Sequence, residues 1–197
     1  MIIWNKRPTH SPTPQELQPG GMSLVGFLER GQTIEQVMER DRKALEMLGY
    51  TTQEVAGLLA PVTEKAANGE NFEYTAPNGK QFQVKVQTWM GTQECPWRDK
   101  VDWRKSSGAM DMHLTEKGEG GKPVHIAGLV RHLVEEHGFF EGGSYRVAPE
   151  KIVAMFGTEK IPGSLAKVGK LKFLNCSALP SKNRARKKFR PIKPRPI

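Results

Sequence analysis

Apolar residues recur at every third or fourth position in two segments between residues 33 and 69, a pattern typical of amphipathic helices. The first predicted helix begins at the capping box Thr33-Ile34-Glu35-Gln36 and ends at Gly49. A second capping box, Thr51-Thr52-Gln53-Glu54, begins a helix that ends near Pro61 or resumes as far as Asn68. We therefore predict two helices joined by a short turn, an αα-hairpin.

After residue 71 the helical pattern gives way to strict alternation of apolar and polar residues, which is typical of half-buried strands. A turn at residues 77–79, Pro-Asn-Gly, separates two such segments and predicts a β-hairpin. A third strand is predicted over residues 110–115. The apolar positions of the three strands are Phe72, Tyr74, Phe82, Val84, Val86, Met110, Met112 and Leu114.

Two further helices are predicted in the last part of the patterned region. The longer one runs over residues 124–137 and ends at Gly138, with Phe139 as the apolar residue expected of a Schellman motif. The shorter one begins with Pro149 in the first helical position and ends at Gly157. The apolar stripe of the longer helix consists of Ile126, Leu129, Val130, Leu133 and Val134.

Together these elements predict an α+β fold with a small antiparallel sheet packed with about four to five helices. We expect the globular domain to cover residues 22–157. Residues 1–21 contain four prolines and end in two glycines, which predicts an extended, Pro-rich arm. Residues 158–197 have little periodicity and form a basic, proline-containing tail that we expect to be extended.

Composition narrows the class of protein. Only 37% of the residues are hydrophobic, which indicates that part of the chain lies outside a core. The longest apolar runs are shorter than the ~18 residues that a membrane helix requires, and the first residues do not resemble a secretory signal. Cys95 and Cys176 lack CxxC spacing, which favours reduced thiols. We expect an intracellular, cytoplasmic protein.

Positive charge is concentrated at one end of the chain. The net charge is +9, and 12 of the 30 Lys and Arg residues lie in residues 160–197, which contain no Asp or Glu. Residues 1–159 therefore hold 18 basic and 21 acidic residues, a net charge of −3. A loose basic segment on a nearly neutral domain is typical of proteins that bind a polyanion.

Nucleic acid is the polyanion that we favour, because spaced basic groups can each neutralise a phosphate. We favour RNA over DNA, since no groove-reading helix or zinc module is visible. The prediction is a non-enzymatic component of a larger nucleoprotein assembly, with protein partners there and without a cofactor or catalytic residue. The predicted phosphate contacts are Lys182, Arg184, Arg186, Lys187, Lys188, Arg190, Lys193 and Arg195.

A second basic and aromatic cluster lies between the predicted strands. Trp97, Arg98, Trp103 and Arg104 offer planar groups that can stack on unpaired bases, and we include them in the predicted nucleic-acid interface. Acidic residues interrupt this cluster, and tryptophans also commonly pack under loops. Stacking on bases and packing in the core therefore remain alternatives for these residues.

The tail also permits other functions. Polybasic segments are attracted to anionic membrane surfaces, although we consider a membrane partner the weaker choice. Residues 188–194 match a loose K-x-x-P-x-x-P pattern, so an adaptor with a polyproline-type ligand is an alternative function. A solubilising or address function without direct contacts is the simplest alternative.

Histidines in the longer predicted helix raise the question of a metal-dependent or acid–base enzyme. His132 and His137 are five positions apart, about 140° around a helix, so we predict that they cannot share a metal on one helical face. His125, His132 and Glu136 align within about 40° on such a helix and form the alternative enzymatic face. The preferred prediction nevertheless assigns no metal.

Overall fold

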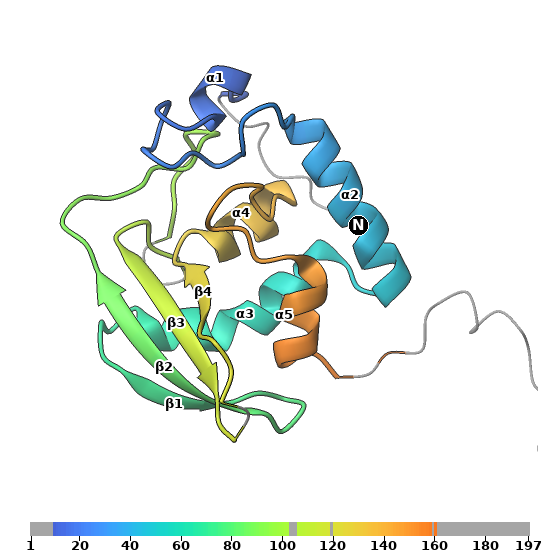
Figure 1. Ribbon diagram of the computed structural model, residues 1–197, viewed down its shortest axis with the longest axis vertical. Helices are drawn as coiled ribbons and strands as arrows, with labels where there is room; N and C mark the ends of the chain where they lie inside the picture. Colours follow the sequence, from blue (N-terminus) through green and yellow to red (C-terminus); the bar gives the residue numbers. More distant parts are fainter. Residues whose placement is uncertain (1–9, 103–105, 119, 159, 161–197) are drawn as a thin grey trace, which may run out of the picture.

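A four-stranded antiparallel sheet forms one layer of the computed structural model, which describes residues 10–102, 106–118, 120–158 and 160 (Figure 1). The strands follow one another in chain order across the sheet, β1-β2-β3-β4. Their bounds are β1 (Phe72–Thr75), β2 (Gln81–Thr88), β3 (Met110–Glu116) and β4 (Val124–Ala127).

Five helices accompany the sheet in the described part of the chain, which confirms the predicted α+β class. Those that pack against the sheet lie on one side of it (Figure 1). No helix among the described residues is long and apolar enough to cross a membrane. The helix bounds are α1 (Pro14–Leu17), α2 (Ile34–Leu48), α3 (Thr52–Ala66), α4 (Val130–His137) and α5 (Pro149–Phe156).

Local sequence signals set the ends of the longer helices, as predicted. The Thr33 hydroxyl accepts a hydrogen bond from the Gln36 backbone N–H at 3.3 Å, and Thr51 does the same for Glu54 at 3.2 Å. Gly49 ends α2 in the left-handed conformation with φ of 70°. These caps satisfy backbone groups that a helix end leaves without partners.

The main core lies between the sheet and helices α3, α4 and α5. In β2 the side chains of Phe82 and Val84 are buried, and in β3 those of Met112 and Leu114 are buried, so the alternation predicted from the sequence is confirmed. The register places Val84 opposite Leu114 and aligns these apolar residues on the face toward the helices. Burial of this face is the principal source of hydrophobic stabilisation.

A smaller apolar cluster, the second cluster, lies beside the main core and is built mainly from loops and helix ends. The N-terminal segment, the loop between β2 and β3, and α4 contribute to it. Its buried members are Leu17, Phe27, Leu28, Val37, Cys95, Trp97, Leu129, Leu133 and Phe139.

The helix predicted over residues 124–137 is shorter in the structure. Val124–Ala127 forms β4, with Ile126 paired opposite Met112 and buried, and α4 begins only at Val130. The prediction was wrong here because, in so short a segment, apolar residues at every second position fit the pattern of a helix as well as that of a strand. Gly128 lies between the strand and the helix. A Cβ atom on this residue would lie 2.2 Å from the Ser107 carbonyl oxygen.

The N-terminal segment also differs from the prediction of an extended arm. Residues 14–17 form the short helix α1, whose first position is Pro14 and whose cap is Thr13. Proline is compatible with the first turn because that N–H has no partner in a helix. Leu17 is buried in the second cluster, so this segment packs against the domain.

Candidate metal centre

Four potential metal ligands from two distant segments converge beside the second cluster. Cys95 and Asp99 belong to the long loop, defined here as residues 89–109 between β2 and β3, and His132 and His137 belong to α4. One ligand atom from each of the four residues lies within 4.8 Å of those of the other three. The convergence places a thiol, a carboxylate and two imidazoles around one point.

A tight turn in the long loop positions the first two ligands. The Arg98 N–H donates to the Cys95 carbonyl oxygen at 2.8 Å, which brings Cys95 and Asp99 to the same side of the turn. Arg98 takes the left-handed conformation, with φ of 56°. At the base of the loop the Gln93 N–H donates to the Gly108 carbonyl oxygen at 3.0 Å, which holds the two limbs together.

The C-terminal end of α4 positions the two histidines. His137 is the last residue of the helix, and Gly138 follows in the left-handed conformation with φ of 66°. The Phe139 N–H donates to the Leu133 carbonyl oxygen at 3.0 Å, so the predicted Schellman-type end is confirmed. Trp97 stacks on the His137 ring, with centroids 4.0 Å apart and an interplanar angle of 6°, and so restricts the orientation of the imidazole.

Three contacts within the cluster are close to the separations between ligands in a tetrahedral metal site. His132 Nε2 lies 3.1 Å from Asp99 Oδ1, and His137 Nε2 lies 3.2 Å from Asp99 Oδ2. Cys95 Sγ lies 3.4 Å from His137 Nε2. Bonds of about 2.0–2.3 Å to a tetrahedral zinc ion separate neighbouring ligand atoms by about 3.3–3.6 Å, which is close to these distances.

Burial changes the protonation of these groups. Burial, together with nearby Asp99, raises the pKa of the Cys95 thiol to about 12. Burial also lowers the pKa of His137. The pKa of Asp99 is lowered because contacts with Cys95 and His132 outweigh the opposing effect of its burial. Without a metal ion, the pKa of Cys95 thus favours a neutral thiol beside a carboxylate.

The same geometry is unsuited to a Cys–His–Asp catalytic triad. In a triad the histidine contacts the nucleophile with one ring nitrogen and the orienting carboxylate with the other. Here Cys95 and Asp99 both contact Nε2 of His137. The raised pKa of Cys95 also disfavours the thiolate that nucleophilic attack requires.

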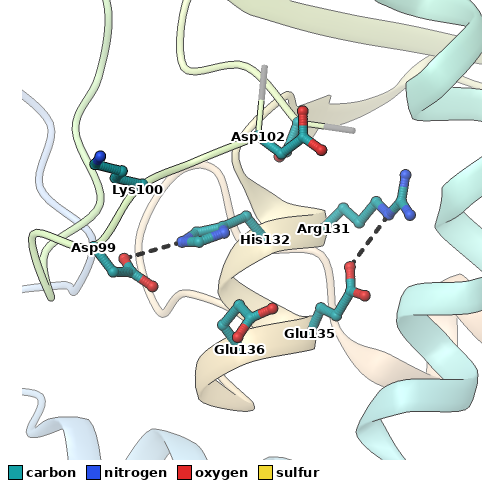
Figure 2. Close-up of a pocket in the computed structure, with 8 residues that line it drawn as sticks. Asp99, Lys100, Asp102, Arg131, His132, Glu135 and Glu136 are labelled. Atoms are coloured by element: carbon teal, nitrogen blue, oxygen red, sulfur yellow. Dashed lines mark hydrogen bonds and ion pairs between the residues drawn. The ribbon is translucent and has the colours of Figure 1, made fainter. Parts of the chain in front are cut away.

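Two cavities adjoin the cluster. The smaller, of about 180 Å³, is lined mainly by charged residues of the long loop and α4, and Figure 2 shows Asp99 and His132 contacting one another at its edge. The larger, of about 420 Å³, lies within the long loop. The larger cavity is lined by Thr92, Gln93, Glu94, Cys95, Arg98, Asp99, Val101, Ser106, Ser107 and Gly108.

The structure brings His132 and His137 into one cluster, although the angular argument predicted that they cannot share a metal on one helical face. The angular argument treated the site as a patch on the side of a helix, whereas the two rings bracket a point near its C-terminal end, opposite Asp99. The spacings Cys-x₃-Asp and His-x₄-His both lie within the ranges seen for zinc ligands, C-x₂₋₄-C and H-x₃₋₅-H. These two spacings were the signal in the sequence from which the site could have been predicted.

The alternative face of His125, His132 and Glu136 does not form. His125 lies on β4 rather than on the helix, stacked on His113 at 4.8 Å, with its Nε2 3.3 Å from Asp111 Oδ2. His132 turns instead toward Asp99. The predicted alignment required a continuous helix over residues 124–137, and that helix is absent from this described segment.

The predicted nucleic-acid residues are distributed unevenly. Trp97 is buried between His137 and Phe139, which favours core packing over base stacking. Arg98 is exposed and forms an ion pair with Glu16 at 2.7 Å. Trp103 and Arg104 lie outside the described residues. So do the predicted tail contacts Lys182, Arg184, Arg186, Lys187, Lys188, Arg190, Lys193 and Arg195.

Comparison of the chain with protein-family models, with curated proteins and with solved structures gave no match.

Proposed function

We propose that this protein binds a zinc ion through Cys95, Asp99, His132 and His137, and that the ion holds the long loop against α4. The observation that carries the proposal is the convergence of four ligand atoms within 4.8 Å of one another, with Nε2 of each histidine in contact with the Asp99 carboxylate. Imidazole, thiolate and carboxylate are the ligand types that zinc accepts in tetrahedral sites.

Charge supports a divalent ion at this position. A Cys95 thiolate and the Asp99 carboxylate supply two negative charges, and the two histidines ligate as neutral imidazoles. A zinc ion therefore neutralises the cluster. It also removes the mutual repulsion that otherwise disfavours ionisation of Cys95 beside Asp99.

A structural role follows from burial and connectivity. Cys95 and His132 are buried, the side chain of His137 is only 7% exposed, and four protein ligands complete a tetrahedral coordination sphere. Because the ligands come from segments more than thirty residues apart, the metal cross-links the long loop to the helix. Coordination of this kind contributes directly to folding.

Metal analysis of the purified full-length protein tests the proposal. We expect about one zinc per chain, and about one cobalt after replacement. In the cobalt form Cys95 should give a sulfur-to-metal charge-transfer band in the near ultraviolet. Cys95→Ser should abolish this band, whereas the control Cys176→Ser should retain it.

Three results would overturn the assignment. One is a protein that takes up no zinc or cobalt when metal is supplied in excess. Another is unchanged metal affinity in the folded variants Cys95→Ser and His137→Ala, each verified by circular dichroism. A charge-transfer band lost in Cys176→Ser and retained in Cys95→Ser would place the metal elsewhere in the chain.

We also propose, as a second function, that the basic tail binds nucleic acid, with RNA favoured. The supporting observation is the segregation of charge, with twelve basic and no acidic residues in 160–197 against a net charge of −3 in 1–159. Each phosphate contact releases counterions, so affinity should fall steeply with salt. The zinc-stabilised domain then serves to hold the tail within a larger assembly.

Removal of residues 180–197 tests this second function. Binding to single-stranded RNA should be mostly lost, and the slope of log affinity against log salt should become shallower. Undiminished RNA binding by the truncated chain would exclude the tail as the contact. If instead Pro191→Ala and Pro194→Ala abolish capture of a protein partner, the polyproline-ligand alternative is favoured.

A further inference from the structure

One turn of the long loop joins the proposed zinc site to the N-terminal part of the described chain. This ligand turn, defined here as residues 95–99, begins and ends with the proposed ligands Cys95 and Asp99. Between them lies Arg98, whose guanidinium donates to the Glu16 carboxylate of α1 at 2.7 Å (Figure 1 shows α1 beside this loop). The turn is thus connected to the metal through its two ends and to α1 through one ion pair.

Glu16 also holds the α1 segment, defined here as residues 10–22, in its folded form. One carboxylate oxygen, Oε2, accepts from the Thr13 N–H at 2.8 Å and lies 3.0 Å from His10 Nε2, while the other, Oε1, accepts from Arg98. The Thr13 N–H and His10 lower the pKa of Glu16 to about 2, so this carboxylate is ionised at neutral pH. A single side chain thus joins the start of the α1 segment to the long loop.

The helix α1 is too short to keep its structure without contacts to the rest of the domain. It has four residues, whereas isolated helices shorter than about 12 residues are marginal even in favourable sequences. Its buried residue, Leu17, is 1% exposed and belongs to the second cluster together with Cys95 and Trp97 of the ligand turn. The Leu17 carbonyl oxygen accepts from the Phe27 N–H at 2.8 Å, within the same N-terminal part of the chain. Docking of α1 therefore depends on the position of the ligand turn.

We propose that zinc controls the docking of the α1 segment. With the metal bound, the ligand turn presents Arg98 to Glu16 and Leu17 is enclosed; without it, the turn relaxes, the ion pair is lost and the segment leaves the second cluster. The inference rests on the zinc site proposed above. It adds a conformational switch to the structural role assigned there, because one ion would decide whether a distant segment of the chain is docked.

The backbone of the ligand turn gives the physical reason for this coupling. Arg98 has φ of 56°, a left-handed conformation that non-glycine residues keep mainly where the surrounding structure enforces it. Ligation of both Cys95 and Asp99 would enforce it from either end. Trp97 stacks on the ring of His137, itself a proposed ligand, so this contact of the turn also depends on the metal. When the ion leaves, the φ angle of Arg98 can return to negative values, which moves its side chain away from α1.

Amide hydrogen exchange of the full-length protein, measured with zinc bound and after removal of the metal by a chelator, tests the inference. We expect exchange in residues 14–22 to accelerate about tenfold or more when the metal is removed, while β2 and β3 stay protected. Binding of the fluorescent dye ANS should increase at the same time, because undocking uncovers the apolar surface around Leu17.

Arg98→Gln removes the ion pair and leaves the four ligands in place. Its zinc content should equal that of the native protein. Exchange of residues 14–22 in its zinc form should be about two- to fivefold faster than in native protein, the change expected from loss of a solvent-exposed ion pair. Arg98→Lys, which keeps the charge, should restore most of the protection. The exposed Arg30 lies outside the α1 segment and gives the matched control Arg30→Gln, which should show native exchange rates.

A protein that binds zinc but shows the same exchange in residues 14–22 with and without the metal would overturn the inference and leave the zinc proposal intact. Equal exchange in native protein and Arg98→Gln would also overturn it, because the ion pair then does not couple the ligand turn to α1. Acceleration of β2 and β3 to the same extent as residues 14–22 would show general unfolding rather than a switch. Failure of the native protein to bind zinc would contradict the zinc proposal itself, and the inference with it.

Discussion

The main core and the second cluster are stabilised in different ways. The main core is enclosed by strands and helices, whose regular hydrogen bonds hold the backbone in place while side chains such as Val84 and Leu59 pack between them. The second cluster draws residues from α1, the segment around Phe27, the long loop and α4. Loop segments lack a regular ladder and need other cross-links.

This difference explains where the proposed zinc site lies. The four ligands stand at the edge of the second cluster, with Cys95 itself among the buried residues and Trp97 packed on His137. A metal ion there joins segments that no strand pairing or helix joins in the described structure. We infer that the metal substitutes for secondary structure in this half of the domain.

Truncation of one buried leucine in each region provides the largest expected effect. Leu59→Ala in the main core and Leu133→Ala in the second cluster should each lower the free energy of unfolding by about 2–5 kcal/mol in denaturant titrations. Only Leu133→Ala should also weaken zinc binding, because Leu133 shares α4 with both histidines. Equal zinc affinities in the two variants would separate the metal site from the packing of the second cluster.

Zinc itself should stabilise the domain through the second cluster. At free zinc about a thousandfold above the dissociation constant, the expected gain is about 4 kcal/mol in the free energy of unfolding. His137→Ala should lose this gain and His113→Ala, on the sheet, should keep it.

Removal of the zinc by a chelator should accelerate amide hydrogen exchange in residues 89–102 and 106–109, while β2 and β3 stay protected. Equal acceleration of exchange in all of these segments would contradict a localised role of the metal.

Glu141 should make stability depend on pH. It is 1% exposed, and burial, with nearby Asp111, raises its pKa from 4.5 to about 8. Between these pH values the unfolded chain ionises Glu141 while the folded chain keeps it protonated, so stability falls as pH rises. The slope is at most about 1.4 kcal/mol per pH unit and vanishes below pH 4.5 and above pH 8.

Glu141→Gln should remove this contribution, so the stability of the variant relative to the native protein should increase from pH 5 to pH 8. Thermal unfolding at several pH values, in the same metal state, measures the difference. The exposed Glu70 gives the control variant Glu70→Gln, which should leave the pH dependence unchanged. A difference between Glu141→Gln and native protein that is constant across pH would exclude ionisation as the cause.

Helix caps give the smallest expected effect. Thr33→Ala and Thr51→Ala remove the side chains that cap α2 and α3, and each should cost about 1 kcal/mol in the free energy of unfolding. Neither residue touches the ligand cluster, so zinc affinity should be unchanged in both. A marked loss of affinity in either variant would show that the metal site depends on helix stability in general.

Much of the fold could be predicted because its signals are local. The caps at Thr33 and Thr51, the alternation around Phe82, and the glycine stop at Gly138 each act through neighbours in sequence. The error over residues 124–127 arose where a short apolar run is compatible with either structure. This segment is a strand because it pairs with β3, and the local sequence pattern does not show that β3 lies beside it.

The candidate site could be predicted only in part. The spacing of His132 and His137 was visible, but their convergence depends on Asp99, which lies more than thirty residues earlier in the chain. Trp97 was recognised as either a stacking or a packing residue, and its burial against His137 favours packing. The contacts of Arg98 likewise could not be predicted from its own segment, because its ion-pair partner Glu16 lies in the N-terminal segment.

By itself, the amino-acid sequence determined the class of fold, the ends of most helices and the concentration of positive charge in residues 160–197, because these follow from local pattern and from counting charges. Tertiary structure alone decided that His125 belongs to a strand and that Cys95 and Asp99 meet the two histidines of α4. The physical reason is that contacts between distant segments depend on how whole elements pack, and no short stretch of sequence specifies that packing.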